Sequence, residues 1–338
     1  MKRSPYRSGA AAAGAAGRPM PRWFSERDVR QALAMPALID AMAEALARFS
    51  SGDIEQPVRT AIETGPRCFF GVMPAFDAGR GILGCKLVSV FPPNAARGLP
   101  THQAMIALFD AETGSLEAVL DGRYITEART AAVSAVSLRQ LARPDADVLA
   151  ILGSGVQARS HLEAFRHIRR FRKVRAWSPT AEHLHRFAGE CGIEPAVSAE
   201  AAVRGAGVVV VATDSVSPVL ESGWVSPGAH VVAIGACRPS QREIDSALVA
   251  RAALFVDSRI AALVESGDIV QPIAEGRIDA RHIRAELGQV VARTSPGRRS
   301  AEEVTLFKSL GLAIEDIAAA ALACRGASNS EDSKAVTF

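Results

Sequence analysis

The spacing of hydrophobic positions along the chain changes character near its middle. In the first part, helical periodicity starts at a Ser25–Asp28 capping motif and runs to about Phe49, with an interruption near Pro36. Short apolar runs bounded by turn residues follow, and a turn at 110–114 joins the last two. These runs predict a β region built from hairpins, with strands at 58–63, 68–73, 83–91, 105–109 and 116–120.

The second part alternates buried strands with helical stretches. A helix is predicted over 125–141, where Pro144 follows shortly after its end. The strands beyond it are predicted at 148–152, 173–177, 208–212, 230–234 and 254–257. Strands that alternate with helices indicate a doubly wound parallel sheet, the Rossmann arrangement. Residues 306–324 predict a long Ala-rich helix that packs back on the first part of the chain. The fold class is therefore α/β, a Rossmann sheet plus a discontinuous α+β domain.

Composition and charge narrow the class of protein. The chain has 338 residues, 48% of them hydrophobic, which is enough for two cores. A net charge of +3, without a basic stripe among aromatics, argues against a nucleic-acid partner. No apolar run approaches the roughly 20 residues of a membrane span, so no membrane association is expected. Five scattered cysteines without a C-x-x-C pair indicate a reduced protein of the cytoplasm. No metal site is predicted.

A glycine-rich turn at the start of the second part predicts a dinucleotide site. The first apolar strand leads directly into Gly-Ser-Gly-Val-Gln-Ala at 153–158, and a helix-compatible stretch follows. Such a strand, turn and helix N-terminus cradle a pyrophosphate. The candidate cofactor residues of this turn are Gly153, Ser154, Gly155, Val156 and Gln157.

The end of the next strand bears on the choice between the two nicotinamide cofactors. NAD sites place an acid there for the ribose hydroxyls. This chain instead has Ser178 and Thr180, which donate hydrogen bonds, and its first acid is Glu182. Without a carboxylate to repel a 2′-phosphate, NADP(H) is favoured over NAD(H).

One lysine in the first part stands out. Arginine outnumbers lysine 34 to 5 in this chain, yet Lys86 lies inside an apolar strand. Burial would lower the pKa of its ammonium group and suit it to acid–base chemistry. The alternative is a lysine that reaches solvent from an edge strand.

Two arginines and several strand-end residues complete the candidate site. Arg59 and Arg129 are candidates for binding a carboxylate through paired hydrogen bonds, although arginines in such a chain are usually surface residues. His102 is either a site residue or part of a turn. Thr213 and Cys237 follow strands of the second sheet, at the edge where ligands of such sheets bind.

Eight segments, taken together, resemble the ornithine cyclodeaminase/mu-crystallin family. Among them are Cys-Lys-Leu-Val at 85–88, Arg-Thr-Ala-Ala at 129–132 and Phe-Lys-Ser-Leu-Gly at 307–311. The others lie at 56–60, 101–104, 151–158, 235–239 and 265–268. Because the segments follow in order over residues 21–325, the resemblance covers nearly the whole chain.

The resemblance implies a homodimer that acts on a small amino-acid-derived substrate. Residues 21–128 with 308–327 would form the substrate-binding and dimerisation domain, and 129–307 the Rossmann domain. Residues 1–20 are expected to be a disordered extension and 328–338 a flexible tail. Arg59, Lys86 and Arg129 would hold the substrate, with Glu265 a further pocket residue. The nucleotide would be bordered by the glycine turn and by Thr101, His102, Thr130, Ser178, Thr180, Thr213 and Ser309.

One position departs from part of the family. The cyclodeaminase branch carries an aspartate two residues after the glycine that corresponds to Gly235, and this chain has Cys237 there. The chain therefore looks closer to the ketimine reductases, and the resemblance implies reduction of pyrroline-2-carboxylate or piperideine-2-carboxylate. The alternatives are a cyclodeaminase, an amino-acid dehydrogenase, a hydroxyproline dehydratase, or a nucleotide-dependent ligand-binding protein.

Overall fold

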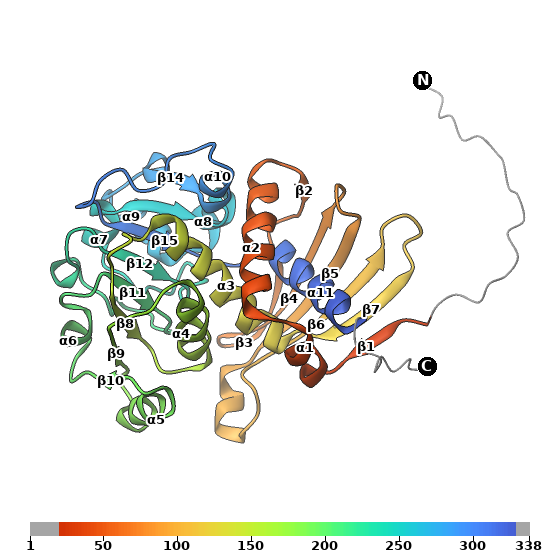
Figure 1. The fold of residues 1–338 in the computed structure, drawn as a ribbon, viewed down its shortest axis with the longest axis horizontal. Coiled ribbons are helices and arrows are strands. Elements are labelled where there is room, and N and C mark those ends of the chain that lie inside the picture. Colours follow the sequence, from red (N-terminus) through yellow and green to blue (C-terminus); the bar gives the residue numbers. More distant parts are fainter. Residues whose placement is uncertain (1–19, 329–338) are drawn as a thin grey trace, which may run out of the picture.

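The computed structural model describes residues 20–328, which are organised around two β-sheets that lie side by side (Figure 1). The expected N-terminal extension and C-terminal tail lie outside this range apart from Met20 and Ser328. Within the range, no helix is both long and apolar enough to cross a membrane.

The N-terminal sheet is mainly a meander of antiparallel hairpins, as the apolar runs predict. Its path is β1-β7-β6-β5-β4-β2, with β3 also paired to β4. The five predicted strands are confirmed, whereas β1 and β2 are too short to show a pattern. The bounds are β1 (Arg22–Phe24), β2 (Ile54–Glu55), β3 (Thr60–Gly65), β4 (Cys68–Asp77), β5 (Ile82–Val90), β6 (His102–Asp110) and β7 (Leu116–Asp121).

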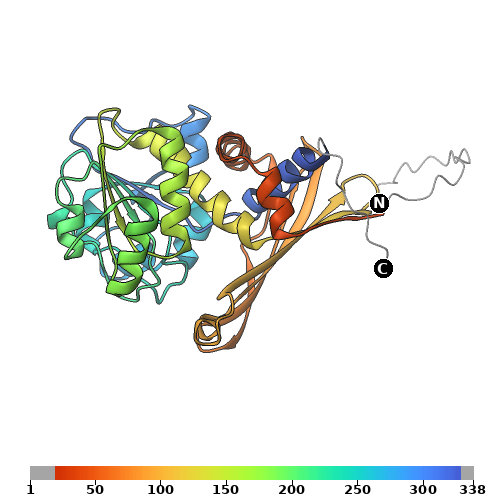
Figure 2. The ribbon, with the colours of Figure 1, turned by 60° about the horizontal axis from the view of Figure 1, so that its bottom comes forward.

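Helices cover only one face of this sheet (Figure 2). Helix α11 (Ala313–Ser328) packs on β4, β5 and β6, and both α1 (Glu26–Ala32) and α2 (Met35–Ser50) pack against α11. The predicted capping box of α1 is present at Ser25. On the opposite face no element of residues 20–328 lies over the strands in Figure 2.

Helix α3 (Arg123–Leu141) connects the two sheets. It packs on α2 and α11 at one side and on α4, β12 and β15 at the other. The expected domain boundary at 128/129 lies inside this helix. Because α3 is buried along most of its length, it fixes the two sheets relative to each other.

The second sheet is parallel throughout, with the order β10-β9-β8-β11-β12-β15-β13-β14. The five predicted strands are confirmed in it. Its strands are β8 (Val148–Leu152), β9 (Lys173–Trp177), β10 (Glu194–Pro195), β11 (Val208–Val211), β12 (His230–Ala233), β13 (Ala253–Val256), β14 (Ile283–Glu286) and β15 (Thr305–Lys308). Its helices are α4 (Val156–Ile168), α5 (Ala181–Cys191), α6 (Ala199–Val203), α7 (Ser246–Arg251), α8 (Arg259–Glu265), α9 (Gly267–Ala274) and α10 (Leu287–Val291). Short 3-10 helices lie at Pro92–Arg97, Ser222–Trp224 and Ala280–His282.

The prediction of one helix over 306–324 is wrong in its first part. Residues Thr305–Lys308 form β15, which is paired on both sides, with β12 and β13. Gly311 then adopts a φ of +84°, and the helix begins only at Ala313. A short apolar run carries no period that separates a central strand from the first turn of a helix.

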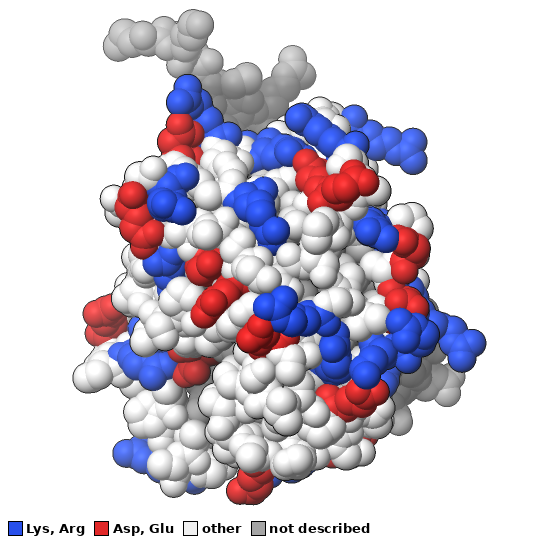
Figure 3. Space-filling view, turned by 90° about the vertical axis from the view of Figure 1, so that its left-hand side faces the viewer, with Lys and Arg blue, Asp and Glu red and all other residues white. Residues whose placement is uncertain are grey.

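The face of the molecule formed by the second sheet and its helices carries mixed charges. In Figure 3, lysine and arginine side chains are interspersed with aspartate and glutamate. Exposed ion pairs such as Arg172–Asp147 and Arg204–Glu200 illustrate this mixing.

Candidate active site

Lys86 is buried in the middle of the N-terminal sheet. Its strand, β5, lies between β4 and β6, so the alternative of an edge-strand lysine does not apply. The side chain is 3% exposed, and Nζ lies 2.5 Å from Oδ2 of Asp316 at the start of α11. Burial lowers the pKa of Lys86 to about 8, although the Asp316 carboxylate opposes this shift. The ammonium group is therefore poised to give up a proton near neutral pH.

Arg129 binds the same carboxylate from the other side. Its Nε lies 2.9 Å from Oδ1 of Asp316, and its Nη1 lies 2.6 Å from Oε2 of Glu315. Burial raises the pKa of Asp316, but Arg129 and Lys86 outweigh it and hold the pKa below its ordinary value. One aspartate thus fixes a guanidinium and an ammonium group side by side.

Arg59 reaches this cluster from the segment before β3. Its Nε lies 3.0 Å from Oε1 of Glu265, which joins two of the predicted site residues. Its Nη2 donates to the carbonyl oxygens of Leu310 and Gly311, at 2.7 and 3.3 Å. Burial raises the pKa of Glu265, with Arg59 opposing the shift.

The connection between β15 and α11 sets the spacing of the two arginines. Asp257 accepts hydrogen bonds through Oδ2 from Ser309 Oγ, Leu310 N and Gly311 N, at 3.1, 2.5 and 2.7 Å. A Cβ atom at Gly311 would lie 2.5 Å from Nη1 of Arg129, so only glycine lets the guanidinium pack there. Ser309, predicted to border the nucleotide, uses its hydroxyl in this turn.

The two guanidinium groups keep donors for a ligand. Among residues 20–328, Nη1 of Arg59 and Nη2 of Arg129 have no hydrogen-bond partner, and Lys86 Nζ has only Asp316. These three groups are suited to a small anionic substrate. Sequence reasoning missed Asp257, Glu315 and Asp316, because no local pattern distinguishes them from the other acids.

The remaining predicted residues of the N-terminal part lie at the start of β6 and in α3. His102 is half-buried at the start of β6, where burial and the charge of Lys86 lower its pKa to about 4, so its imidazole is neutral. Thr101 precedes it and is exposed. Thr130 is buried in α3 and donates its hydroxyl to the Thr126 carbonyl at 2.7 Å.

The glycine turn fits a pyrophosphate. Gly153 has a φ of +119°, and a Cβ there would overlap the Ala212 carbonyl oxygen. A Cβ at Gly155 would meet nothing within 4 Å, so a ligand can approach the backbone closely. Gly155 also provides no side-chain cap to α4, which leaves the first amide groups of the helix free to bind an anion. The exposed Val156 follows, and Oε1 of Gln157 is buried without a partner among the described residues.

The hydroxyl groups predicted to bind the adenosine end lie next to this turn. Ser154 Oγ donates to Ser178 Oγ at 2.9 Å. Thr180 is exposed at the N-terminus of α5 and makes no capping hydrogen bond with its side chain. No carboxylate is part of this Ser154–Ser178 contact.

Thr213 and Cys237 lie at the ends of β11 and β12. The Thr213 amide and hydroxyl donate to Oε1 of Glu243, at 2.7 and 2.8 Å. Cys237 donates its thiol to the Ile234 carbonyl at 3.4 Å, and burial raises the pKa of this thiol. Cys237 is therefore a neutral thiol at neutral pH and offers no base.

Comparison with known proteins identifies close relatives along nearly the whole chain. Residues 22–330 match the ornithine cyclodeaminase/mu-crystallin family. The chain is 43% identical over 309 residues to "Ketimine reductase mu-crystallin" of Mus musculus, covering 89% of this chain and 96% of that protein.

Solved structures of related proteins share the fold. The Delta(1)-pyrroline-2-carboxylate reductase of Thermococcus litoralis, in complex with NADH and L-proline, has a TM-score of 0.89 and 36% identity, covering 93% of this chain and all of that one. An archaeal alanine dehydrogenase dimer with bound NAD has a TM-score of 0.89 and 32% identity, covering 94% and 99%.

Proposed function

This chain belongs to the ornithine cyclodeaminase/mu-crystallin family, and on that premise we propose that it reduces a small cyclic ketimine carboxylate with a nicotinamide dinucleotide. Pyrroline-2-carboxylate and piperideine-2-carboxylate are the candidate substrates, and proline and pipecolate the products. The observation that carries the proposal is the buried Asp316 carboxylate, which holds Lys86 and Arg129 together near Arg59.

Arg59 and Arg129 bind the substrate carboxylate. Each guanidinium is fixed by an acid and retains a free Nη donor, as described above. A carboxylate that accepts from both donors is held in one orientation, with its imine carbon fixed. Such fixed geometry lowers the entropic part of the reaction barrier.

Lys86 holds the proton that the reaction needs. When bound, the reduced nicotinamide supplies the hydride. An imine accepts hydride far better once its nitrogen is protonated, and the Lys86 ammonium, with a pKa of about 8, is a suitable acid. Asp316 keeps the ammonium in place but, with both oxygens engaged, does not compete for the substrate nitrogen.

Cys237 favours reduction over deamination. Removal of a proton from an amine needs a base, and a buried neutral thiol is not one.

All five cysteines, at positions 68, 85, 191, 237 and 324, are free. Free thiols support the cytoplasm as the site of action.

NADP(H) is the cofactor we favour over NAD(H). The support is the Ser154–Ser178 hydroxyl pair beside the glycine turn and the uncapped N-terminus of α5 after Thr180. Hydroxyl groups and free helix amides donate hydrogen bonds to a 2′-phosphate, whereas a carboxylate at this position would repel it.

The proposed reaction is tested with the purified protein, both imines and both reduced cofactors. We expect loss of reduced-nicotinamide absorbance with formation of proline or pipecolate, and a preference for NADPH of roughly tenfold in kcat/KM, equivalent to about 1.4 kcal/mol. Ammonia release from ornithine, or dehydration of hydroxyproline, would overturn the proposal in favour of another family reaction. Similarity to an alanine dehydrogenase makes oxidation of L-alanine the second outcome to measure.

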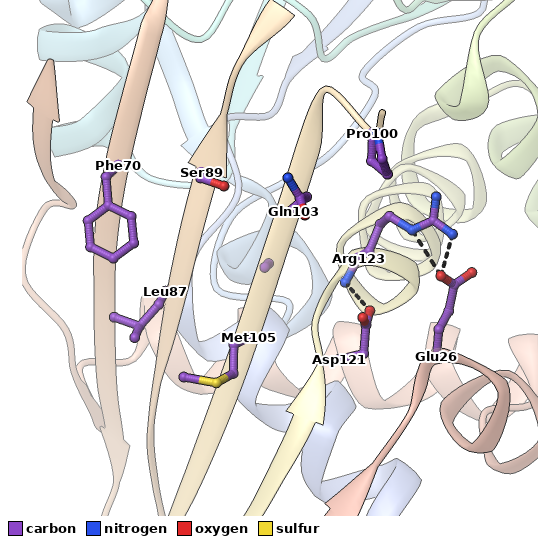
Figure 4. A pocket seen from close by; sticks show the side chains of 10 residues that line it. Glu26, Phe70, Leu87, Ser89, Pro100, Gln103, Met105, Asp121 and Arg123 are labelled. Atoms are coloured by element: carbon purple, nitrogen blue, oxygen red, sulfur yellow. Dashed lines mark hydrogen bonds and ion pairs between the residues drawn. The ribbon is translucent and has the colours of Figure 1, made fainter. Parts of the chain in front are cut away.

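We also propose that the protein is a homodimer paired through the open face of the N-terminal sheet. Figure 4 shows Phe70, Leu87 and Met105 on three neighbouring strands, pointing to the same side, with Ser89 and Gln103 beside them. These residues line a hollow of about 560 Å³. An uncovered sheet face that presents large apolar side chains beside polar ones is typical of a protein interface. A second copy of the chain is the occupant that the dimeric archaeal relative supports.

The dimer is expected to dissociate when a charge is placed on this face. Wild-type protein should have twice the 35.6 kDa chain mass by light scattering, and Leu87→Glu should have the mass of one chain, because the carboxylate would be buried unpaired at the interface. Val197→Glu is the matched control, since Val197 is 95% exposed elsewhere. A Leu87→Glu protein that remains dimeric would place the interface on another surface.

A further inference from the structure

A second buried charge cluster lies behind the strand ends of the Rossmann sheet, outside the substrate site. It consists of Glu243, Asp268 and Lys308, each 1% exposed or less. Lys308 Nζ lies 3.1 Å from Oδ2 of Asp268 and 3.8 Å from Oε2 of Glu243. None of the three has a role in the reaction proposed above. A buried ion cluster costs desolvation free energy, so its geometry calls for an explanation.

Glu243 binds two strand ends with one carboxylate. Its Oε1 accepts the amide and hydroxyl hydrogens of Thr213, which follows β11. Its Oε2 accepts the amides of Gly235 and Ala236, which follow β12, at 2.6 and 3.0 Å. Four donors therefore converge on two oxygens, and only an ionised carboxylate accepts all four.

The neighbours of Glu243 hold it in place. Oδ1 of Asp268 accepts the backbone amides of Glu243 and Ile244, at 2.8 and 3.0 Å. Burial raises the pKa of Glu243 to about 7, and the Lys308 ammonium opposes this shift. Burial likewise lowers the pKa of Lys308, but Asp268 and Glu243 outweigh it and hold that pKa above its ordinary value. The lysine thus supplies a counter-charge that favours the ionised form of the carboxylate.

The two strand ends lie on the nicotinamide side of the sheet. In a doubly wound sheet the pyrophosphate lies at the first strand, here β8, and the two halves of the dinucleotide lie on either side of it. The adenosine side is the side of β9 and Ser178, and the opposite side is that of β11 and β12. A Cβ at Gly235 would overlap the Thr213 carbonyl oxygen, so these two ends pack directly on each other.

We propose that Glu243 is a positioning residue for the nicotinamide half of the cofactor, because its four hydrogen bonds hold the ends of β11 and β12 in one fixed arrangement. The inference rests on the proposed function only in assuming a nicotinamide dinucleotide. Among residues 20–328, Glu243 makes no hydrogen bond to the glycine turn. It acts through Thr213 and the Gly235–Cys237 segment.

The test compares two ligands that differ only by the nicotinamide group. Dissociation constants for NADH and ADP-ribose are measured by calorimetry on wild type and Glu243→Gln, with no imine present. The amide group of glutamine directs hydrogens at backbone N–H groups, so we expect NADH to bind about tenfold more weakly while ADP-ribose affinity stays unchanged. ADP-ribose binding also shows that the variant is folded.

Two further variants sharpen the comparison. Glu243→Asp keeps the charge but shortens the reach, and we expect it to lose NADH affinity by less than Glu243→Gln. Glu275→Gln is the matched control, because Glu275 is exposed and pairs with the half-buried Arg242. Equal weakening of both ligands in Glu243→Gln would show a merely structural role and overturn the proposal, as would unchanged NADH affinity. Failure to reduce any imine would overturn the proposed reaction but not this result.

Discussion

Lys86→Met is expected to reduce turnover of the cyclic imine by roughly 10²- to 10⁴-fold, the usual contribution of a positioned acid. Methionine fills a similar volume, and Asp316 keeps Arg129 as its partner, so the fold is expected to survive. NADPH affinity should remain near the wild-type value, because Lys86 lies on β5, away from the glycine turn. The measurements are steady-state kinetics with piperideine-2-carboxylate and calorimetry with the cofactor.

The pH dependence provides an independent check on Lys86. With a pKa of about 8, the ammonium donor is present below that pH and is lost as pH rises through it. Wild-type kcat/KM should therefore fall on the alkaline side, and Lys86→Gln should lack this limb. Lys173→Met is the matched control, because Lys173 is partly exposed at the surface beside Glu194. Unchanged turnover in Lys86→Met would remove this residue from the mechanism.

Arg129→Met is expected to destabilise the protein by about 3–5 kcal/mol, the usual effect of removing one partner of a buried ion pair. The substitution leaves Glu315 without its cation, and Asp316 with only Lys86, in a site where both carboxylates are fully buried. Loss of a substrate guanidinium should also raise KM. Urea unfolding of the apoprotein measures the first effect, and kinetics on the folded fraction measures the second.

Arg139→Met on the same helix is the control for this prediction. Its partner Asp40 is 74% exposed, so we expect a loss of about 0–1 kcal/mol. Adding Glu315→Leu to Arg129→Met should recover part of the stability, because it removes the carboxylate that Arg129→Met leaves without a cation. If Arg129→Met and Arg139→Met lowered the free energy of unfolding equally, the buried ion pairs of Arg129 would contribute no more to stability than an exposed pair.

Local patterns were sufficient to predict most of the fold. The capping box at Ser25, the hairpin strands and the glycine turn each depend on residues adjacent in sequence. The strand β15, which the sequence predicts as helix, does not depend on adjacent residues in this way. It is a strand because it pairs with β12 and β13, which lie far away in the chain. Its four residues show no period of their own.

From the residues alone the sequence predicts only the cations of the site, and the resemblance to the family adds the acid Glu265. Lys86 stood out because lysine is rare in this chain, and its burial is confirmed. The acids that hold these cations carry no such signal. Asp316 is separated in sequence from Lys86 by 230 positions and from Arg129 by 187. Glu243 lies in a loop whose sequence shows no recognisable motif. Only the packing of α11 onto the N-terminal sheet shows that Glu315 and Asp316 are buried, and hence that they must be paired.

In the proposed reaction, hydride reaches the carbon that bears the substrate carboxylate. The most direct measurement uses reduced cofactor labelled with deuterium at its transferable position, piperideine-2-carboxylate as substrate, and mass spectrometry with NMR on the product. We expect pipecolate with one deuterium at Cα. Consumption of the cofactor with no deuterium in the amino acid, or label at any other carbon, would contradict it.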